Sequence, residues 1–305
     1  MACAAVLGSP VPAGELPASQ LQVRGRSGWV TWWESGRAPA VWRSPDAAVA
    51  AAVAWRPAAA GMEWGELSLA GSGEAWRLLV VLVRLDPARV RLELVRSSRE
   101  GGTLVAWSLD DLPAGAVLGV NAGQFTGGMP WGWLVRHGEV EQPAGAGPLS
   151  MAVTVLGDGR VGFLPEGAIP SSDTGGAREA FQSYPTLLSG DGEVPPPLCR
   201  SGLGVDVGHR DARLAVGELR DGGVLVALTR FAAAGDTLGS LPFGPTVPEM
   251  AALMGALGCR RAVALDGGIS AQLALRGGDG TLHAWRGWRQ VPLALVAYPR
   301  GSAGR

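Results

Sequence analysis

The chain has 305 residues, a formal net charge of −1 and 47% hydrophobic residues, and it contains no lysine. These values exclude a wholly disordered chain and give no reason to expect nucleic acid or an anionic membrane as a partner. No uninterrupted stretch of about 18 apolar residues is present, so the sequence predicts no transmembrane segment. The absence of lysine also excludes a Walker A phosphate loop and the kinase site that His209-Arg210-Asp211 would otherwise suggest.

The N-terminal quarter differs in composition from the rest of the chain. Residues 1–13 are small and apolar, but they lack the basic start and the apolar core of a signal peptide. Residues 1 to about 45 are rich in Pro, Gly, Ser and Trp and show no clear periodicity. We therefore expect residues 1–75 to form an extension, with a weak helix candidate at 46–55, that packs on a main body at residues 76–300.

The pattern of the main body predicts mostly strands. Residues 77–84 and 90–95 are predicted to pair through a turn at Asp86-Pro87. Further strands and hairpins are predicted at residues 132–140, 151–163 with a turn at 157–159, 214–231 with a turn at 221–223, and 291–298.

One helix is clearly predicted near the C-terminal end. Thr246 and Glu249 form a capping box, apolar residues follow at 250, 253, 254 and 257, and Gly258 is placed to end the helix. Residues 176–182 are a weaker helix candidate, and residues 190–204 are expected to form a surface loop. Many strands and few helices favour an α+β fold, a single large domain with a mixed, mainly antiparallel sheet.

The segment around Asp266 carries the clearest functional signal. Four apolar residues, 262–265, end at this carboxylate, and Gly267, Gly268 and Ser270 follow it. The pattern predicts a buried strand with Asp266 at its tip, where glycines let the backbone turn sharply or approach a ligand. The alternative interpretation is an ordinary hairpin turn, as we expect at Asp158, Asp191 and Asp221, each of which also precedes a glycine.

A second segment resembles the first. Asn121 follows the apolar run 116–120 and is the only asparagine in the chain, so it is a candidate for a function. Asparagine also forms turns by capping its own backbone, which is the alternative for this position.

Histidine and cysteine give no clear site. The three histidines, at 137, 209 and 283, lack zinc-site spacing, and we interpret each as structural. The cysteines are Cys3, Cys199 and Cys259; the last two either pair in an oxidising compartment or remain free thiols.

Five segments in order resemble the phosphodiester glycosidase family. They cover about residues 75–300: Asn-Ala-Gly-Gln-Phe at 121–125, Pro-Trp-Gly-Trp-Leu-Val-Arg-His-Gly at 130–138, Pro-Thr-Leu-Leu-Ser-Gly-Asp-Gly at 185–192, Ala-Arg-Leu-Ala-Val-Gly at 212–217, and Leu-Gly at 257–258 followed by Ala-Leu-Asp-Gly-Gly-Ile-Ser-Ala at 264–271. Ile269 stands where the family has glycine and Ala271 where it has serine, and residues 122, 124 and 214 also differ. These departures leave substrate identity and activity open.

The resemblance implies a hydrolase that cleaves a sugar-1-phosphodiester at the anomeric carbon, giving a free sugar and a phosphomonoester. Such a site needs a cation for phosphate, a carboxylate that activates water or attacks C1, and hydrogen bonds to the sugar. We expect the catalytic residues to be Asp266, Arg213 as the phosphate ligand, and Asn121. The substrate-binding candidates are Gly267, Gly268, Ser270, Gly123, Gln124, Trp131 and Asp173. Trp131 and Trp133 both lie close to Asn121 in sequence, and either could hold a sugar ring, although core packing is the default for tryptophan.

Several alternatives stay open at this point. Asp173 and Asp206 are candidates for a second carboxylate, although the favoured role of each is that of a turn or cap residue. Ile269 and Ala271 favour a second hypothesis, a non-catalytic module that binds glycans. A third hypothesis is a metal-dependent hydrolase that uses Asp206, Asp211 and Asp266. Under the first hypothesis, hydrolysis of a sugar phosphodiester, no cofactor is expected. The expected partner is a sugar-phosphate glycan in envelope polysaccharide, and a protein that acts on such a glycan is expected to be extracytoplasmic.

Overall fold

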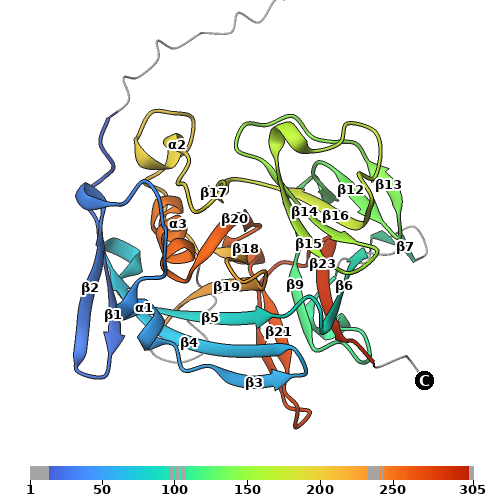
Figure 1. The fold of residues 1–305 in the computed structure, drawn as a ribbon, viewed down its shortest axis with the longest axis horizontal. Coiled ribbons are helices and arrows are strands. Elements are labelled where there is room, and N and C mark those ends of the chain that lie inside the picture. The colour runs from blue at the N-terminus through green and yellow to red at the C-terminus, as the bar shows by residue number, and fades with distance from the viewer. Residues whose placement is uncertain are drawn as a thin grey trace, which may run out of the picture.

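The computed structural model describes residues 14–96, 99–100, 103–104, 107–232, 241 and 243–301. Within these residues, all the strand pairings are antiparallel (Figure 1). The predicted α+β class, with mainly antiparallel strands and few helices, is confirmed.

The largest sheet runs in the order β17-β20-β18-β19-β5-β4-β1-β2, and β3 pairs with β4. Its strands are β1 (Gln20–Gly25), β2 (Gly28–Glu34), β3 (Arg56–Ala59), β4 (Met62–Gly71), β5 (Leu78–Leu85), β17 (Thr186–Leu188), β18 (Leu214–Leu219), β19 (Val224–Phe231) and β20 (Cys259–Leu265). The segment expected to be an extension thus supplies four strands to the sheet that also contains β18, β19 and β20.

Two five-stranded sheets complete the main body. One has the order β13-β12-β16-β14-β15 and the other β22-β21-β9-β23-β6. Their strands are β6 (Val90–Arg96), β9 (Leu118–Asn121), β12 (Leu134–Arg136), β13 (Glu139–Gln142), β14 (Met151–Leu156), β15 (Val161–Pro165), β16 (Ala177–Ser183), β21 (Leu273–Arg276), β22 (Leu282–Trp285) and β23 (Leu293–Pro299). Two short pairs add β7 (Arg99–Glu100) with β8 (Thr103–Leu104), and β10 (Phe125–Thr126) with β11 (Met129–Pro130).

The predicted helix is α3 (Val247–Ala256), and its capping box is present. The Thr246 hydroxyl accepts a hydrogen bond from the Glu249 amide at 3.3 Å, and the Glu249 carboxylate accepts one from the Thr246 amide at 2.9 Å. Gly258 follows with φ 94°, as expected for the residue that ends a helix. Two short helices are also described, α1 (Ala47–Ala52), inside the predicted range 46–55, and α2 (Pro196–Cys199), inside the predicted loop.

Two local predictions were wrong. Strands β5 and β6 do not pair, because β4 and β19 already occupy both edges of β5, and the turn at Asp86 redirects the chain to a different sheet. Residues 176–182 form strand β16 rather than a helix. Helix-forming residues such as Ala and Glu are common there, but the segment lies between β12 and β14, and tertiary pairing overrides local propensity.

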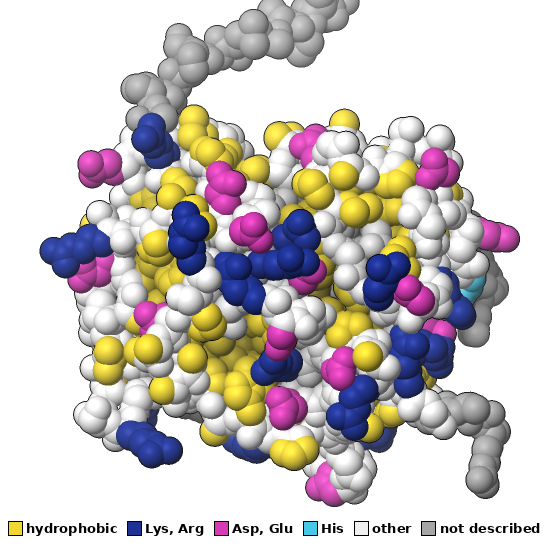
Figure 2. Space-filling view, viewed as in Figure 1, with side chains coloured by type: hydrophobic (Ala, Val, Ile, Leu, Met, Phe, Trp, Pro, Cys, Tyr) yellow, Lys and Arg dark blue, Asp and Glu magenta, His cyan; other side chains and the backbone are white. Residues whose placement is uncertain are grey.

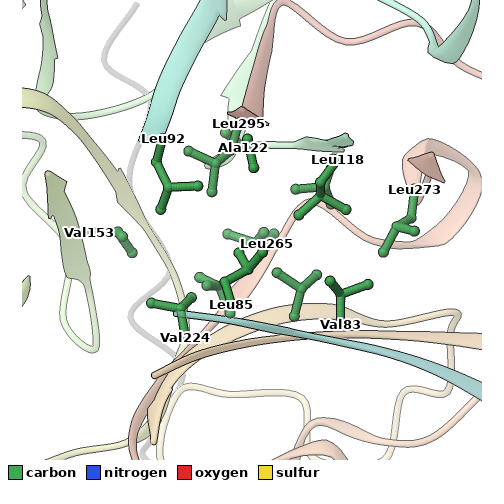
Figure 3. Close-up of a cluster of buried hydrophobic side chains, with 14 of the residues drawn as sticks. Val83, Leu85, Leu92, Leu118, Ala122, Val153, Val224, Leu265, Leu273 and Leu295 are labelled. Atoms are coloured by element: carbon green, nitrogen blue, oxygen red, sulfur yellow. The ribbon is translucent and has the colours of Figure 1, made fainter. Parts of the chain in front are cut away.

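The main hydrophobic core lies where the three sheets meet. Figure 3 shows Val83, Leu265, Leu118, Leu273 and Val153 pointing toward one another from β5, β20, β9, β21 and β14. A second core fills the space between the large sheet and helices α1 and α3. Because β9 and β20 both contribute side chains to the first core, their C-terminal ends are held in fixed positions, and Asn121 and Asp266 lie at those ends.

The face of the molecule shown in Figure 2 carries charges of both signs. In Figure 2 the dark blue arginines and the magenta acidic side chains are interspersed over the face shown. Among the described residues, no helix is long and apolar enough to cross a membrane. Cys199 and Cys259 are both free thiols.

Candidate functional site

The site is built on the turn that follows β20. Glycine is required at position 268, where φ is 57°, and the amide of Gly268 donates a 2.7 Å hydrogen bond to the carbonyl of Ala212. A single 3-10 turn, Gly268–Ser270, then carries the chain toward β21. The amide of Asp266 donates to the carbonyl of Gly123 at 2.9 Å, which joins this turn to the one after β9.

Asn121 ties the two turns together. Its side chain is completely buried; the amide nitrogen donates to the backbone carbonyl of Asp266, and the amide oxygen accepts from the Gln272 amide at 3.2 Å. Both ends of the side-chain amide are thus engaged by the backbone of the turn that carries Asp266. The structure places Asn121 in contact with the Asp266 segment, where it fixes the backbone rather than presenting its amide to a ligand.

The Asp266 carboxyl group is partly buried at the centre of this arrangement. Burial raises its pKa, a hydrogen bond from Ser270 and the positive charge of Arg289 lower it, and nearby Asp211 raises it again, with a net upward shift. Its Oδ2 atom is buried and has no hydrogen-bond partner among the described residues. A carboxylate whose pKa is raised and whose oxygen lacks a partner is typical of a reactive group.

Asp211 is a second carboxyl group at the same turn. A Cβ atom at Gly268 would lie 2.7 Å from Asp211 Oδ2, so this carboxylate packs directly against the glycine. Burial raises the pKa of Asp211, while Arg213 and His209 oppose the shift. Sequence reasoning considered Asp211 only as a metal ligand and did not expect it as the second carboxylate.

The two residues that were expected as the second carboxylate lie elsewhere. Asp173 is exposed, and its Oδ1 accepts the Gly175 amide at 2.7 Å, as in an ordinary turn. Asp206 Oδ1 likewise accepts the amides of Gly208 and His209, at 3.1 and 3.0 Å. Both carboxylates therefore serve their own turns, and Asp206 also lines a neighbouring pocket.

Arg213 approaches the site from β18. Leu214 pairs with Leu265, so Arg213 lies next to Asp266 across the two strands. Its Nε donates to the carbonyl of Pro245 at 3.0 Å and one Nη to the carbonyl of His209 at 2.6 Å. Burial lowers the pKa of Arg213, and Asp211 partly offsets this effect. Its second Nη makes no hydrogen bond within the described residues and is free for an anion.

A pocket of about 680 Å³ adjoins Arg213. Trp131 and Tyr184 form one wall, with their ring centroids 5.0 Å apart and their planes at 76°. Gln124 supports that wall, because its side-chain amide donates to the Tyr184 carbonyl at 3.0 Å. Trp133, in contrast, is completely buried and donates its indole N–H to the Asp173 carbonyl at 3.2 Å. Of the two neighbouring tryptophans, only Trp131 lines the pocket.

The remaining candidates are glycines, and one neighbour of the site was missed. A Cβ atom at Gly123, where φ is 68°, would lie 3.1 Å from the Gln182 carbonyl, so glycine is needed there for close packing. Arg289 was not expected; it lies near Asp266, with its guanidinium 5.3 Å from the centroid of the Phe125 ring. No local sequence pattern distinguishes it from the other arginines.

The described residues were also considered as metal ligands. In this part of the chain, no three His, Cys, Asp or Glu side chains converge as a metal site would require. Of the three residues in the metal hypothesis, Asp206 already caps its own loop, while Asp211 and Asp266 lie near each other.

Comparison with known proteins places this geometry in context. Residues 114–298 match the phosphodiester glycosidase family. The catalytic domain of zebrafish N-acetylglucosamine-1-phosphodiester alpha-N-acetylglucosaminidase, auto-inhibited by its pro-peptide, is similar in structure, with a TM-score of 0.60, 17% identity, and coverage of 82% of this chain and 89% of that one.

A hypothetical protein from Synechocystis is also similar, with a TM-score of 0.51, 15% identity, and coverage of 79% of this chain and 62% of that one. The present chain therefore spans less than two thirds of the Synechocystis protein. The search among curated proteins gave no match. The structural similarities establish the fold, and because the family match covers more than half of the sequence, the chain belongs to the phosphodiester glycosidase family.

Proposed function

We propose that this chain hydrolyses the glycosidic bond of a sugar-1-phosphodiester, in the manner of an N-acetylglucosaminidase. The observation that supports this proposal most is the proximity of two carboxyl groups with raised pKa, Asp266 and Asp211, with the partly unpaired guanidinium of Arg213 close to Asp211. Family membership supports a glycosidase-type activity in general. An extracytoplasmic location, with a sugar phosphodiester of the cell envelope as the substrate, is part of the same proposal.

The chemistry assigns separate tasks to these groups. Breaking the bond between C1 and the phosphate oxygen leaves its electron pair on the phosphate, which is a good leaving group without strong acid assistance. Arg213 would hold the phosphate through its free Nη, because a guanidinium stays charged when partly buried. Asp266 would attack C1 or take the proton of the attacking water, and a carboxylate with raised pKa is the stronger base once ionised.

Asn121 and Ser270 would act on Asp266 rather than on the sugar. Asn121 fixes the backbone at Asp266, and Ser270 donates its hydroxyl to the carboxylate. Such groups hold the reacting carboxylate in one orientation, which is a large part of what a preorganised site contributes.

The test uses N-acetylglucosamine 1-(4-nitrophenyl phosphate) and detects the two products, sugar and 4-nitrophenyl phosphate. Asp266→Asn should lower kcat by about 10³-fold or more, since it removes the base or nucleophile. Asp221→Asn is the matched control, because Asp221 also precedes a glycine at a strand end but is exposed and distant from the turn. Wild type and Asp266→Asn that are equally inert, or equally active, would contradict the proposal.

Hydrolysis in ¹⁸O-labelled water identifies the bond that breaks. Cleavage at C1 places the label in the sugar, whereas attack at phosphorus places it in the phosphate. Label found in the phosphate would assign the chain to phosphodiesterases of another kind.

One observation favours a second function, a non-catalytic module that binds glycans. Ile269, at the centre of the 3-10 turn, is 41% exposed and offers an apolar contact beside Asp266. This alternative predicts saccharide binding by calorimetry that is unchanged in Asp266→Asn, with no product formed by either protein.

A further inference from the structure

The pocket next to Arg213 is apolar over most of its wall and polar at one end. Its apolar part includes Trp131, Tyr184, Leu203 and Val205. Its volume of about 680 Å³ is within the usual range for small-molecule sites and far larger than one phosphate group requires. The pocket therefore has space for the group attached to the phosphate.

The aromatic wall is held in place by the backbone around it. The amide of Trp131 donates to the Gln124 carbonyl at 2.8 Å. Gly145 and Gly147 pack against the indole, and a Cβ at Gly145 would lie only 2.9 Å from ring atoms. Since glycine at 145 leaves the space that the ring occupies, the apolar surface exists before any ligand binds, which lowers the entropic cost of binding.

The polar groups lie together at the end of the pocket near Asp211, whose Oδ2 is 3.7 Å from His209 Nε2. Arg213, His209 and Asp206 line that end. The Asp206 carboxylate is already engaged by two backbone amides, so the guanidinium is the group left to bind an anion. A ligand with an anionic head at Arg213 would extend its other end along Trp131 and Tyr184.

We infer that this pocket binds an apolar aglycone, aromatic or alkyl, of the sugar phosphodiester, and that it selects such substrates over those in which the phosphate joins two sugars. This inference rests on the proposed function, with Arg213 as the phosphate ligand. A second sugar would bring several hydroxyl groups against a wall dominated by hydrocarbon, and hydroxyls that lose water without gaining partners weaken binding. An aryl or alkyl group gains from burial against the same wall.

The experiment compares three diesters of N-acetylglucosamine 1-phosphate, with methyl, 2-phenylethyl and glucose (through O6) as aglycones. The expected kcat/KM for the 2-phenylethyl diester is about tenfold or more above the other two, mostly through KM, a difference equivalent to about 1.4 kcal/mol. Trp131→Ala should remove this advantage, lowering kcat/KM for the 2-phenylethyl diester far more than for the methyl diester, whereas Trp131→Phe should keep most of it.

Two further variants separate the pocket from general effects on folding. Leu203→Ser alters the apolar wall at a side chain that is already 41% exposed, and it should reduce the preference without lowering Tm. Trp29→Ala removes an exposed tryptophan on β2, outside the pocket, and should leave all three rates unchanged. A glucose aglycone that reacts as well as 2-phenylethyl, or a loss in Trp131→Ala that is equal for all three diesters, would overturn the inference.

Binding of the product monoesters tests the pocket independently of turnover. By calorimetry, 2-phenylethyl phosphate should bind about tenfold more tightly than methyl phosphate or glucose 6-phosphate, and Trp131→Ala should abolish the difference. If the wild type cleaves none of the diesters but shows this preference, the proposed hydrolysis fails and the apolar site stands. Equal affinity for the three monoesters would exclude the apolar site even in an active enzyme.

Discussion

Asp221-Gly222 and Asp266-Gly267 are the same dipeptide, and both lie at strand ends in the large sheet. Asp221 is in the hairpin between β18 and β19, where its carboxylate accepts the Gly223 amide at 3.0 Å and pairs with Arg84. Burial raises its pKa somewhat, but the Gly223 hydrogen bond and Arg84 outweigh that effect, so its pKa is lowered. At Asp266 burial dominates, and the pKa is raised.

The difference lies in what surrounds the two turns. The carboxylate of the hairpin turn is exposed and has two partners, the Gly223 amide and the Arg84 guanidinium. The Asp266 turn is surrounded by segments that are distant in sequence, including Asn121, 145 residues away. Identical local sequences therefore give a solvated turn in one place and a partly desolvated carboxyl group in the other. The predictions below test whether these surroundings, rather than the dipeptide, create the site.

The largest effect on stability is expected for Asn121→Asp. This substitution removes the link between a distant side-chain amide and the Asp266 turn, for which the Asp221 turn has no counterpart. The substitution keeps the shape of the side chain but replaces a buried donor with a carboxylate facing the Asp266 carbonyl. One carboxylate oxygen would keep the Gln272 amide as a donor, but the other would face the Asp266 carbonyl, and a buried charge in this position should cost about 3 kcal/mol or more at neutral pH. Urea unfolding measures this loss, and activity should fall even at temperatures where the variant remains folded.

Asp173→Asn is a suitable reference for Asn121→Asp, because it exchanges the same two residue types, in the opposite direction, in an exposed turn. Its free energy of unfolding should stay within about 0.5 kcal/mol of wild type. If Asn121→Asp were as mild, the Asn121 link would not hold the Asp266 turn.

The second prediction compares two glycines of left-handed conformation. Gly268 has φ 57° and a Cβ there would meet Asp211 Oδ2 at 2.7 Å, whereas Gly222 has φ 86° and open space around it. Alanine at either position must adopt a left-handed backbone conformation, which lowers the free energy of unfolding by about 1–2 kcal/mol. Gly268→Ala must also displace Asp211, so it should be the more destabilising and should lower kcat by at least tenfold, while Gly222→Ala leaves kcat unchanged.

Equal loss of stability and unchanged turnover in both glycine variants would show that Asp211 is not part of the site. Turnover is measured with the nitrophenyl diester under saturating substrate, so that kcat is compared rather than affinity. Circular dichroism melts report the stability difference on the same samples.

The sequence was sufficient for features that depend on local pattern. The β18–β19 hairpin follows from two largely apolar runs and the turn signal between them, and α3 follows from its capping box and the glycine at its end. The strand before Asp266 follows from a short apolar run. In each case neighbouring residues in the chain carry the information.

Other features depend on pairing between distant segments, which local pattern does not contain. Strands 78–85 and 90–96 are adjacent in sequence and yet belong to different sheets, because β4 and β19 compete for the same edges. In the sequence, nothing distinguishes Asp211 from other carboxylates near turns. In the structure, the register of β18 against β20 places it beside Gly268. Arg213 likewise gained its two carbonyl partners from the loops at 209 and 245.

The smallest effect expected is a gain of stability in Asp266→Asn, opposite in sign to that of Asp221→Asn. Because the folded-state pKa of Asp266 is raised, the folded chain binds more protons than the unfolded chain, and its stability falls as pH rises above the unfolded value. Replacing the carboxyl group with a neutral amide removes this loss, so Asp266→Asn should be more stable than wild type by about 1 kcal/mol at pH 7.

The advantage of Asp266→Asn should disappear at a pH below the unfolded pKa, where both states of wild type carry the proton. For Asp221 the folded pKa is lowered, so its contribution is present above the unfolded value and is lost in acid. Asp221→Asn should therefore lower stability at pH 7, by less than about 1 kcal/mol as for exposed ion pairs, and by nothing in acid. Melting curves from pH 3 to pH 8 measure both differences. If both variants changed the stability at pH 7 in the same direction, the Asp266 carboxyl group would be as well solvated as Asp221 in the hairpin. Its surroundings would then not account for a reactive carboxyl group.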